Sequence, residues 1–221
     1  MRRISKLAAP LLLAGIATPA VASDFSLGAT ASTLGVGLEA GYLLNEHLGL
    51  RLGGYALTVN QDGEESGVNY KADLDLANVG LYLDWHPFAG ALRLSAGWFA
   101  TDNGLKATGT PGAGGTYDIG GSTFTAAEVG DLRGDVDLGS SAPFLGLGWV
   151  WGRDDGGLAF SLDFGVLFQG SPDVTLTSTG GTLSGQPALQ DAIADEETQL
   201  RNDLDKYDLY PVASLGLSYR F

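Results

Sequence analysis

Charged side chains recur at alternating positions within segments that are otherwise apolar or small. Residues that alternate along a β-strand share one face, so these charges would lie opposite the apolar face. Asp84 and Arg93 stand symmetrically about Phe88-Ala89, and Glu39 and Arg51 stand similarly about Asn45. Each pair could therefore meet across a hairpin. The full set of candidates is Glu39, Arg51, Asp84, Arg93, Asp163 and Arg220.

Such a set of charges supports two functions. It can be a buried ion-pair network that neutralises charge inside a narrow space. It can also line a gated polar path or binding site for a small solute. Both interpretations stay open at the level of the sequence.

Candidates for catalysis are few. The sequence contains two histidines, His47 and His86, and no cysteine. Both histidines fall at turns that we expect at one end of the molecule. An activated nucleophile needs a base within hydrogen-bond reach, and nothing in the pattern supplies one, so we expect no catalytic residue. The prediction is that the protein is not an enzyme.

Several aspartates gather near the opposite end of the expected strands. Aspartates at strand ends are usually solvated, although a pair of them could form a two-carboxylate catalytic site. Their oxygens also suit divalent cations. Their spacing matches no calcium-loop motif, so we expect no metal and no cofactor. These residues are Asp73, Asp75, Asp131, Asp135 and Asp137.

The elements that must position these side chains are β-strands. Leu158, Phe160 and Leu162 alternate with Ala159, Ser161 and Asp163, and several other segments repeat this period of two. Such alternation indicates strands with one apolar and one polar face. In a soluble sandwich the apolar face forms the core, whereas in a membrane barrel it meets lipid and the polar face points inward.

Residues 1–22 have the features of a cleaved signal peptide. Arg2, Arg3 and Lys6 precede the apolar stretch from Leu7 to Ala17, and Ala20-Val21-Ala22 fits a cleavage site. Cleavage after Ala22 removes three of the 12 basic residues and none of the 26 acidic ones, which leaves a formal charge of −17. This charge argues against nucleic acid as a partner. Residues 23–221 are then one exported domain.

Three features favour the membrane barrel over the sandwich. The strands are about 9–11 residues long or longer, enough to cross a bilayer. Connections alternate between short and long, as in outer-membrane barrels. Aromatic residues lie near strand ends, where an interfacial girdle would need them. These aromatics are Tyr42, Trp85, Trp149, Trp151, Tyr219 and Phe221.

We therefore expect an all-β fold, a closed antiparallel up-and-down transmembrane β-barrel of about eight strands. The expected strands are Phe25–Ala31, Leu34–Leu44, Leu48–Val59, Tyr70–Trp85, Leu92–Thr101, Asp131–Trp151, Leu158–Gln169 and Tyr207–Phe221. The short turns Asn45–His47, Pro87–Ala91 and Gly152–Gly157 should face the periplasm. The long connections Asn60–Asn69, Asp102–Gly130 and Gly170–Lys206 should face outside.

The apolar positions change parity in three places. At Ser32-Thr33 a two-residue turn or a β-bulge in one long strand explains the change, and we favour the turn because bacterial barrels have even strand numbers. The changes at Gly53-Gly54 and at Ala77-Asn78 are interpreted as bulges.

Two long connections carry further features. Asp102–Gly130 is rich in Gly, Thr and Ala and is interpreted as a flexible loop, with a short strand near Ser122–Ala127. A short helix is expected from Pro187 to about Tyr207 in the last long extracellular loop, as a lid, a gate or a recognition surface. We expect Leu200 and Leu204 to be buried against the outer end of the barrel.

The last strand resembles the C-terminal signal of outer-membrane proteins. Its terminal aromatic and alternating apolar residues are Leu215, Leu217, Tyr219 and Phe221. The resemblance implies insertion by the barrel assembly machinery. The 23–221 segment also resembles OmpW-like small barrels in architecture and is similar in plan to a small barrel linked to ornithine uptake. Asp84-Trp-His-Pro-Phe88 and the segment Pro143–Trp149 look like signatures of small outer-membrane proteins.

The leading hypothesis is an outer-membrane barrel that binds a small solute or aids its passage. The alternatives are a structural or surface-interaction barrel without transport and, third, an enzyme acting on outer-leaflet lipid. Expected partners are outer-membrane lipid and lipopolysaccharide, the assembly machinery and a small-molecule solute. We expect a monomer.

Overall fold

The computed structural model describes residues 24–65, 68–112, 114–152, 156–205 and 208–221. The expected signal peptide lies outside these residues. Within the described ranges, no helix combines the length and hydropathy needed to cross a membrane.

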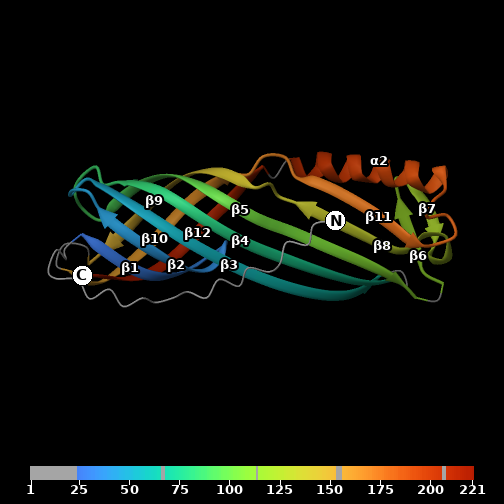
Figure 1. Ribbon diagram of the computed structural model, residues 1–221, viewed down its shortest axis with the longest axis horizontal. Helices are drawn as coiled ribbons and strands as arrows, with labels where there is room; N and C mark the ends of the chain where they lie inside the picture. The colour runs from blue at the N-terminus through green and yellow to red at the C-terminus, as the bar shows by residue number, and fades with distance from the viewer. Residues whose placement is uncertain (1–23, 66–67, 113, 153–155, 206–207) are drawn as a thin grey trace.

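Eight antiparallel strands close into a barrel (Figure 1). The two closing contacts are β1 with β12 and β5 with β9. The predicted fold class is therefore confirmed. The barrel strands are β1 (Phe25–Ser32), β2 (Gly35–Leu43), β3 (Leu48–Glu65), β4 (Val68–Trp85), β5 (Leu92–Pro111), β9 (Ser141–Trp151), β10 (Gly157–Phe168) and β12 (Leu209–Arg220).

The alternation seen in the sequence separates the two faces of the barrel wall. Outward side chains such as Leu38, Leu81 and Leu215 are more than half exposed. Inward side chains such as Arg51 and Asp84 are buried. This is the arrangement of a membrane barrel, in which lipid covers the apolar outer face.

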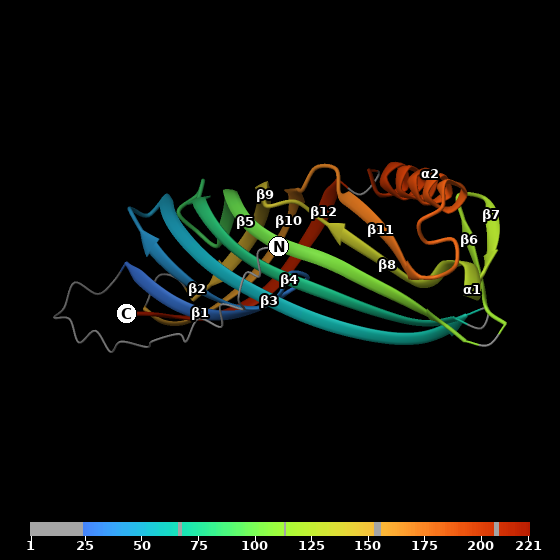
Figure 2. The same ribbon diagram turned by 45° about the vertical axis from the view of Figure 1, so that its right-hand side comes forward.

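One side of the barrel continues well beyond the closed ring. The long strands β3, β4 and β5 extend outward, and β8 (Gly130–Asp137) and β11 (Asp173–Gly180) continue their sheet (Figure 2). We call this part the extension, and we call the end of the barrel from which it projects the extension end. The opposite end of the barrel, with the short connections 44–47 and 86–91, is called the turn end. The expected loops Asn60–Asn69 and Asp102–Gly130 are therefore largely strands, and the prediction of long loops is wrong there. Gly170–Lys206 contains the strand β11 and the predicted helix.

A second layer packs on the far part of the extension. It contains the hairpin β6 (Thr116–Ile119) with β7 (Ser122–Thr125), the short helix α1 (Ala126–Val129) and the helix α2 (Pro187–Leu204). Burial raises the pKa of Tyr117, whose hydroxyl lies 2.9 Å from the carbonyl oxygen of Gly109. The apolar cluster of this layer contains Val68, Tyr117, Ile119, Val129, Leu189, Ala192 and Ile193.

The predicted helix is present and begins at the predicted residue, Pro187. Leu189 and Ile193 are buried in the extension cluster, whereas Leu200 and Leu204 are only half-buried. The prediction that these two leucines are buried against the barrel end is therefore wrong. The reason is that α2 packs along β11 and β6 of the extension rather than over the barrel mouth.

The first hairpin is confirmed, with its turn one residue later than expected. Ser32 pairs with Gly35, so Thr33 and Leu34 form the turn. Gly35 has a φ of 107°, and a Cβ there would lie 2.1 Å from the carbonyl oxygen of Ala56, so only glycine fits.

No bulge accompanies the other two parity changes. The registers of β3 with β4 and of β4 with β5 run without interruption through Gly53-Gly54 and Ala77-Asn78. The prediction of bulges is wrong because the inward face itself turns apolar there, beginning with Tyr55 and Leu76, which are both buried.

The expected strand Asp131–Trp151 is divided. Its two parts, β8 and β9, both pair with β5, and they are separated around Gly139, which has a φ of 88°. The division lies where the extension joins the closed barrel.

Candidate functional site

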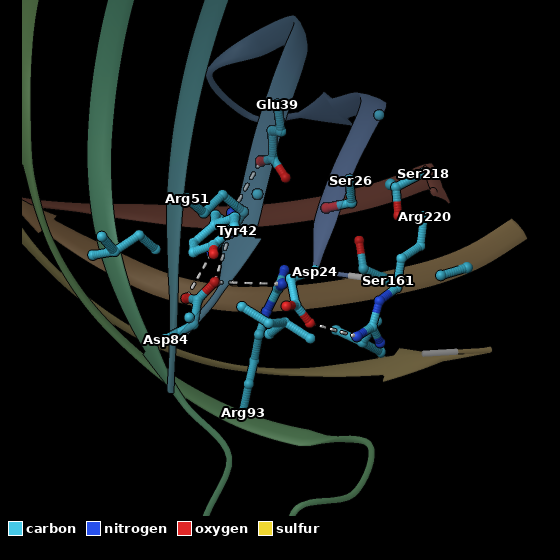
Figure 3. Close-up of a pocket in the computed structure, with 18 of the residues that line it drawn as sticks. Asp24, Ser26, Glu39, Tyr42, Arg51, Asp84, Arg93, Ser161, Ser218 and Arg220 are labelled. Atoms are coloured by element: carbon cyan, nitrogen blue, oxygen red, sulfur yellow. Dashed lines mark hydrogen bonds and ion pairs between the residues drawn. The ribbon is translucent and has the colours of Figure 1, made fainter. Parts of the chain in front are cut away.

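Five of the six predicted lumen charges form one buried network. Glu39 comes from β2, Arg51 from β3, Asp84 from β4, Arg93 from β5 and Asp163 from β10. All five point inward, and Figure 3 shows Arg51 lying between Glu39 and Asp84. With two guanidinium groups and three carboxylates, the network has one carboxylate more than it has cations.

Arg51 holds one half of the network. Its Nε and Nη2 atoms donate to the two Asp84 carboxylate oxygens at 2.9 and 3.2 Å, and its Nη1 atom donates to Glu39 at 3.0 Å. Its guanidinium carbon also lies 3.9 Å from the centre of the Tyr82 ring, within the range of a cation–π contact. Such planar, bidentate contacts orient the guanidinium group in one direction.

Arg93 holds the other half. Its Nε and Nη2 atoms donate to the two Asp163 oxygens at 2.9 and 2.7 Å. The contact between Arg93 Nη1 and Asp84 Oδ2, at 3.6 Å, joins the two halves. The predicted Asp84–Arg93 pair is therefore present as the longest contact of the network, because the strand register places Asp84 opposite Ser95.

Arg220 lies apart from this network. Its Nη2 atom lies 3.7 Å from Asp24, at the turn end of the barrel (Figure 3). Sequence reasoning did not include Asp24 because it precedes the first strand and so belongs to no alternating pattern.

The inward face above the network is apolar and closes the lumen. The rings of Tyr82 and Phe144 lie edge to face at 5.3 Å, and Phe99 packs on both. Sequence reasoning missed this cluster, although the parity changes at Gly53-Gly54 and Ala77-Asn78 were its signal. We call it the plug, and its buried members are Leu34, Tyr55, Tyr82, Phe99, Ala142, Phe144, Leu167 and Val212.

Two tyrosine hydroxyls connect the plug to the charges. Tyr55 donates to Glu39 at 2.6 Å, and the Tyr55 and Tyr82 hydroxyl oxygens are 2.7 Å apart. Movement of Tyr55 would therefore break a hydrogen bond to Glu39, and movement of Tyr82 would shift the ring beside Arg51.

Cavities lie on both sides of the network. A cavity of about 90 Å³ on the turn-end side is lined by Asp24, Glu39, Arg51, Arg93 and Arg220, among others. It has room for a few water molecules or a very small solute. A second cavity of about 10 Å³ lies between the network and the plug. The lumen is thus polar and partly open below the plug.

A polar layer lies above the plug, at the mouth of the barrel. Asn103 Oδ1 accepts from the Ala77 backbone N–H, which fixes the Asn103 Nδ2 group as the donor to Asn78 Oδ1 at 3.0 Å. Asn78 Nδ2 and Gln169 Nε2 are buried donors with no partner among the described residues. Both can donate to water or to an oxygen-bearing solute.

The two histidines and the aspartates expected near the strand ends lie away from the charge network. His86 is buried at the turn end with its Nδ1 atom 3.2 Å from the Leu92 carbonyl oxygen, while the His47 side chain is about half exposed. Asp75 accepts a hydrogen bond from Thr58 on the outer face of the extension. In the described ranges, no three His, Cys, Asp or Glu residues gather to hold a metal ion.

The residues of the C-terminal signal lie on the outer barrel face. Leu215, Leu217, Tyr219 and Phe221 are each about half exposed, and the Tyr219 and Phe221 rings are 5.1 Å apart. Phe221 also stacks on Phe25, the first residue of β1, with ring centroids 6.0 Å apart. An apolar aromatic surface at this level suits the membrane interface.

A closed eight-stranded barrel with an apolar outer face and a charged interior defines the class of small outer-membrane barrels. No protein-family model matches the sequence, and no curated protein matches it. Among solved structures, it is similar to CarO of Acinetobacter baumannii, with 25% identity, a TM-score of 0.61 and coverage of 90% of this chain and 98% of that one.

A second form, CarO2 of the same organism, matches with 24% identity, a TM-score of 0.61 and coverage of 90% and 99%. The alignment with the Ail protein of Yersinia pestis covers 90% of this chain and 97% of that one, with 13% identity and a TM-score of only 0.39. The similarity to CarO supports the outer-membrane barrel fold, while the OmpW-like resemblance is not specifically confirmed.

Proposed function

We propose that this chain is an outer-membrane protein that binds a small polar solute in its lumen and admits it when the plug moves. The observation that carries the proposal is the cavity of about 90 Å³ directly against a buried charge network. The cavity would give a small polar solute direct access to the charged groups of the network.

The unequal charge of the network also supports a ligand. Among the described residues, the contact of Arg93 Nη1 is with Asp84 at 3.6 Å, which is too long for a hydrogen bond. Arg93 and Glu39 both line the turn-end cavity. A small solute carrying a charge or a strong hydrogen-bonding group could replace this long contact with a short one.

The plug makes passage conditional. An eight-stranded barrel is filled by its own side chains and leaves no open channel. The polar mouth around Asn78 and Gln169, the plug, and the charged cavity form a path in which the plug is the barrier. The proposal therefore includes gated rather than continuous conduction.

We also propose the orientation of the barrel. The short turns and the C-terminal strand end would face the periplasm, and the extension would stand outside the cell, as is usual for such barrels. Cleavage of the signal peptide, insertion by the assembly machinery, contact with lipopolysaccharide and a monomeric state belong to the same proposal.

The test is a single-channel measurement combined with solute uptake into vesicles. Purified protein should admit small charged or zwitterionic solutes, and conductance should occur as rare, brief openings. Arg93→Met should reduce uptake, whereas Arg133→Met, on the outer face of the extension, should leave it unchanged. Silent bilayers together with absent uptake for all solutes would refute the proposal.

A structural or surface-interaction role is the second candidate. The observation that favours it is the folded extension, whose two layers exceed what a lumen lid requires. In that case, the protein would bind a surface partner while bilayers stay silent. A lipid-modifying enzyme remains third, because neither histidine lies beside a candidate nucleophile at the extension end.

A further inference from the structure

Strand β3 has an unpaired edge in the extension. Its pairing with β2 ends at Ala56, opposite Val36, while β3 continues to Glu65. From Leu57 onward, β3 pairs only with β4 among the described residues. A row of backbone N–H and C=O groups therefore faces away from the sheet.

The alternation of hydrogen bonds along β3 shows which residues have their backbone N–H and C=O groups at the free edge. The Leu44 N–H donates to the Leu48 carbonyl, and the His86 N–H donates to the His47 carbonyl. Hydrogen-bonded pairs recur at every second residue of an antiparallel ladder, so even-numbered β3 residues bond toward β2 and odd-numbered ones toward β4. The groups that face the free edge belong to Thr58, Asn60, Asp62 and Glu64.

The opposite edge of the extension, formed by β11, is covered by a helix. Strand β11 pairs only with β8 among the described residues, and α2 covers its free side. Glu197 accepts from the Leu176 N–H at 2.6 Å, and Arg201 donates to the Val174 carbonyl at 3.1 Å. One edge is thus satisfied by side chains of the same chain, whereas the β3 edge has no such cover in the described residues.

The two faces along the β3 edge differ in chemistry. On the inner face, Leu57 is half-buried and Val59 is 36% exposed. On the outer face, Asp62 and Glu64 are exposed, and the neighbouring strand β4 adds Asp73 and Asp75. Lys71, opposite Asp62, adds one positive charge, so this part of the face keeps an excess of carboxylates. A second copy of this chain pairing edge to edge would bring these carboxylates together, which disfavours self-association.

We propose that the β3 edge from Leu57 to Glu65 binds an extended, basic segment of a partner protein as an added strand. The backbone of the segment would pair with Thr58, Asn60, Asp62 and Glu64. Its basic side chains would lie beside Asp62 and Glu64, and its apolar side chains would lie beside Leu57 and Val59. Strand addition uses main-chain hydrogen bonds for affinity and alternating side chains for specificity. This surface is separate from the lumen and does not depend on solute passage.

The test uses the full chain in nanodiscs of zwitterionic lipid and a short capped peptide of alternating lysine and valine. Amide hydrogen exchange at Thr58, Asn60, Asp62 and Glu64 should slow about tenfold or more when the peptide binds. Binding should weaken with salt. A peptide with the same residues arranged in two blocks should not protect these amides, because its apolar and basic groups cannot fall on separate faces.

Two variants and one control separate pairing from simple charge attraction. Asn60→Pro removes an edge-facing N–H without removing a bond to β4, so the barrel should still fold and peptide binding should be lost. Asp62→Asn should weaken binding roughly two- to fivefold. Asp135→Asn, on the outer face but away from the edge, should change binding little.

Three results would overturn the proposal. The first is unchanged binding to Asn60→Pro. The second is equal weakening by Asp62→Asn and Asp135→Asn, which would indicate unspecific attraction. The third is protection of these amides by self-association of the chain without peptide, which would make a second copy the occupant.

Discussion

The coupling energies within the lumen network provide the sharpest test of its geometry. We compare Asp84→Ala, Arg51→Met and Arg93→Met, singly and as the two doubles that contain Asp84→Ala. Asp84 accepts two charge-assisted hydrogen bonds from Arg51 but lies 3.6 Å from Arg93. The two pairs share one carboxylate and differ in contact geometry, so the comparison isolates the hydrogen bonds.

The expected magnitudes follow from burial and distance. The Arg51 and Asp84 side chains are 8% and 6% exposed, and removing one partner of such a buried pair costs about 3–5 kcal/mol. Coupling between Asp84 and Arg51 should be about 2–3 kcal/mol, near the upper range for residues in one network. Coupling between Asp84 and Arg93 should be near the lower end, about 0.5 kcal/mol, because no hydrogen bond joins them.

The assay is reversible urea unfolding in lipid vesicles, followed by tryptophan fluorescence. An exposed register pair on the extension, Lys106 with Asp135, provides the control and should couple by less than about 1 kcal/mol. If Asp84 couples to Arg93 as strongly as to Arg51, the bidentate geometry is wrong. If neither pair couples more than the control, the network is not buried.

Four further predictions follow from the same structure. Deleting Phe221, which stacks on Phe25, should slow assembly and leave unfolded protein in the periplasm. Phe99→Ala should cost about 3–5 kcal/mol and raise permeability, because Phe99 is the centre of the plug. Ile193→Asp should detach α2 and make it cleavable by protease added to intact cells. Because burial raises the pKa of Tyr117 in the folded state, the extension should lose stability as the pH rises above about 10.

Each of these has a contrary outcome. Normal assembly without the terminal residue would remove the role of the C-terminal signal. Phe164→Ala, on the outer face, is the control for Phe99→Ala, and equal permeability of the two variants would refute the plug. If α2 stays uncut in the Ile193→Asp variant, contacts other than that of Ile193 hold the helix on the extension. The loss of stability at high pH should be smaller in Tyr117→Phe, since that variant lacks the buried hydroxyl; an unchanged loss would refute the role of Tyr117.

The closed barrel could be predicted because lipid imposes a simple rule on its outer face. Every outward position in the membrane must be apolar, so a period of two appears wherever the inner face is polar or small. The pairing of Glu39 with Arg51 followed from symmetry about a short turn. The partner Asp163 of Arg93 could not be found in this way, because β5 and β10 are not neighbours in the barrel and no turn relates them.

The same rule explains the main errors. Where the inner face becomes apolar at Tyr55 and Leu76, the outer face becomes small or polar, as at Gly54 and Asp75. The apolar positions therefore change parity, which imitates a bulge. Beyond the membrane, the outer face is free to be polar, so the extended parts of β3, β4 and β5 resemble loops in composition. Strand β11 was hidden for this reason, since its segment Asp173–Gly180 consists mainly of Thr, Ser and Asp around Val174 and Leu176.

The division between plug and network has a physical consequence for any solute. Opening the plug by moving Tyr55 or Tyr82 also withdraws a hydroxyl from Glu39 or a ring from Arg51. The carboxylate would then be buried with fewer donors, which costs free energy unless a new donor arrives. A solute that supplies a donor group to Glu39 would offset this cost, whereas an uncharged apolar solute would not. Under the proposed function, the barrier in the lumen would therefore select by hydrogen bonding as well as by size.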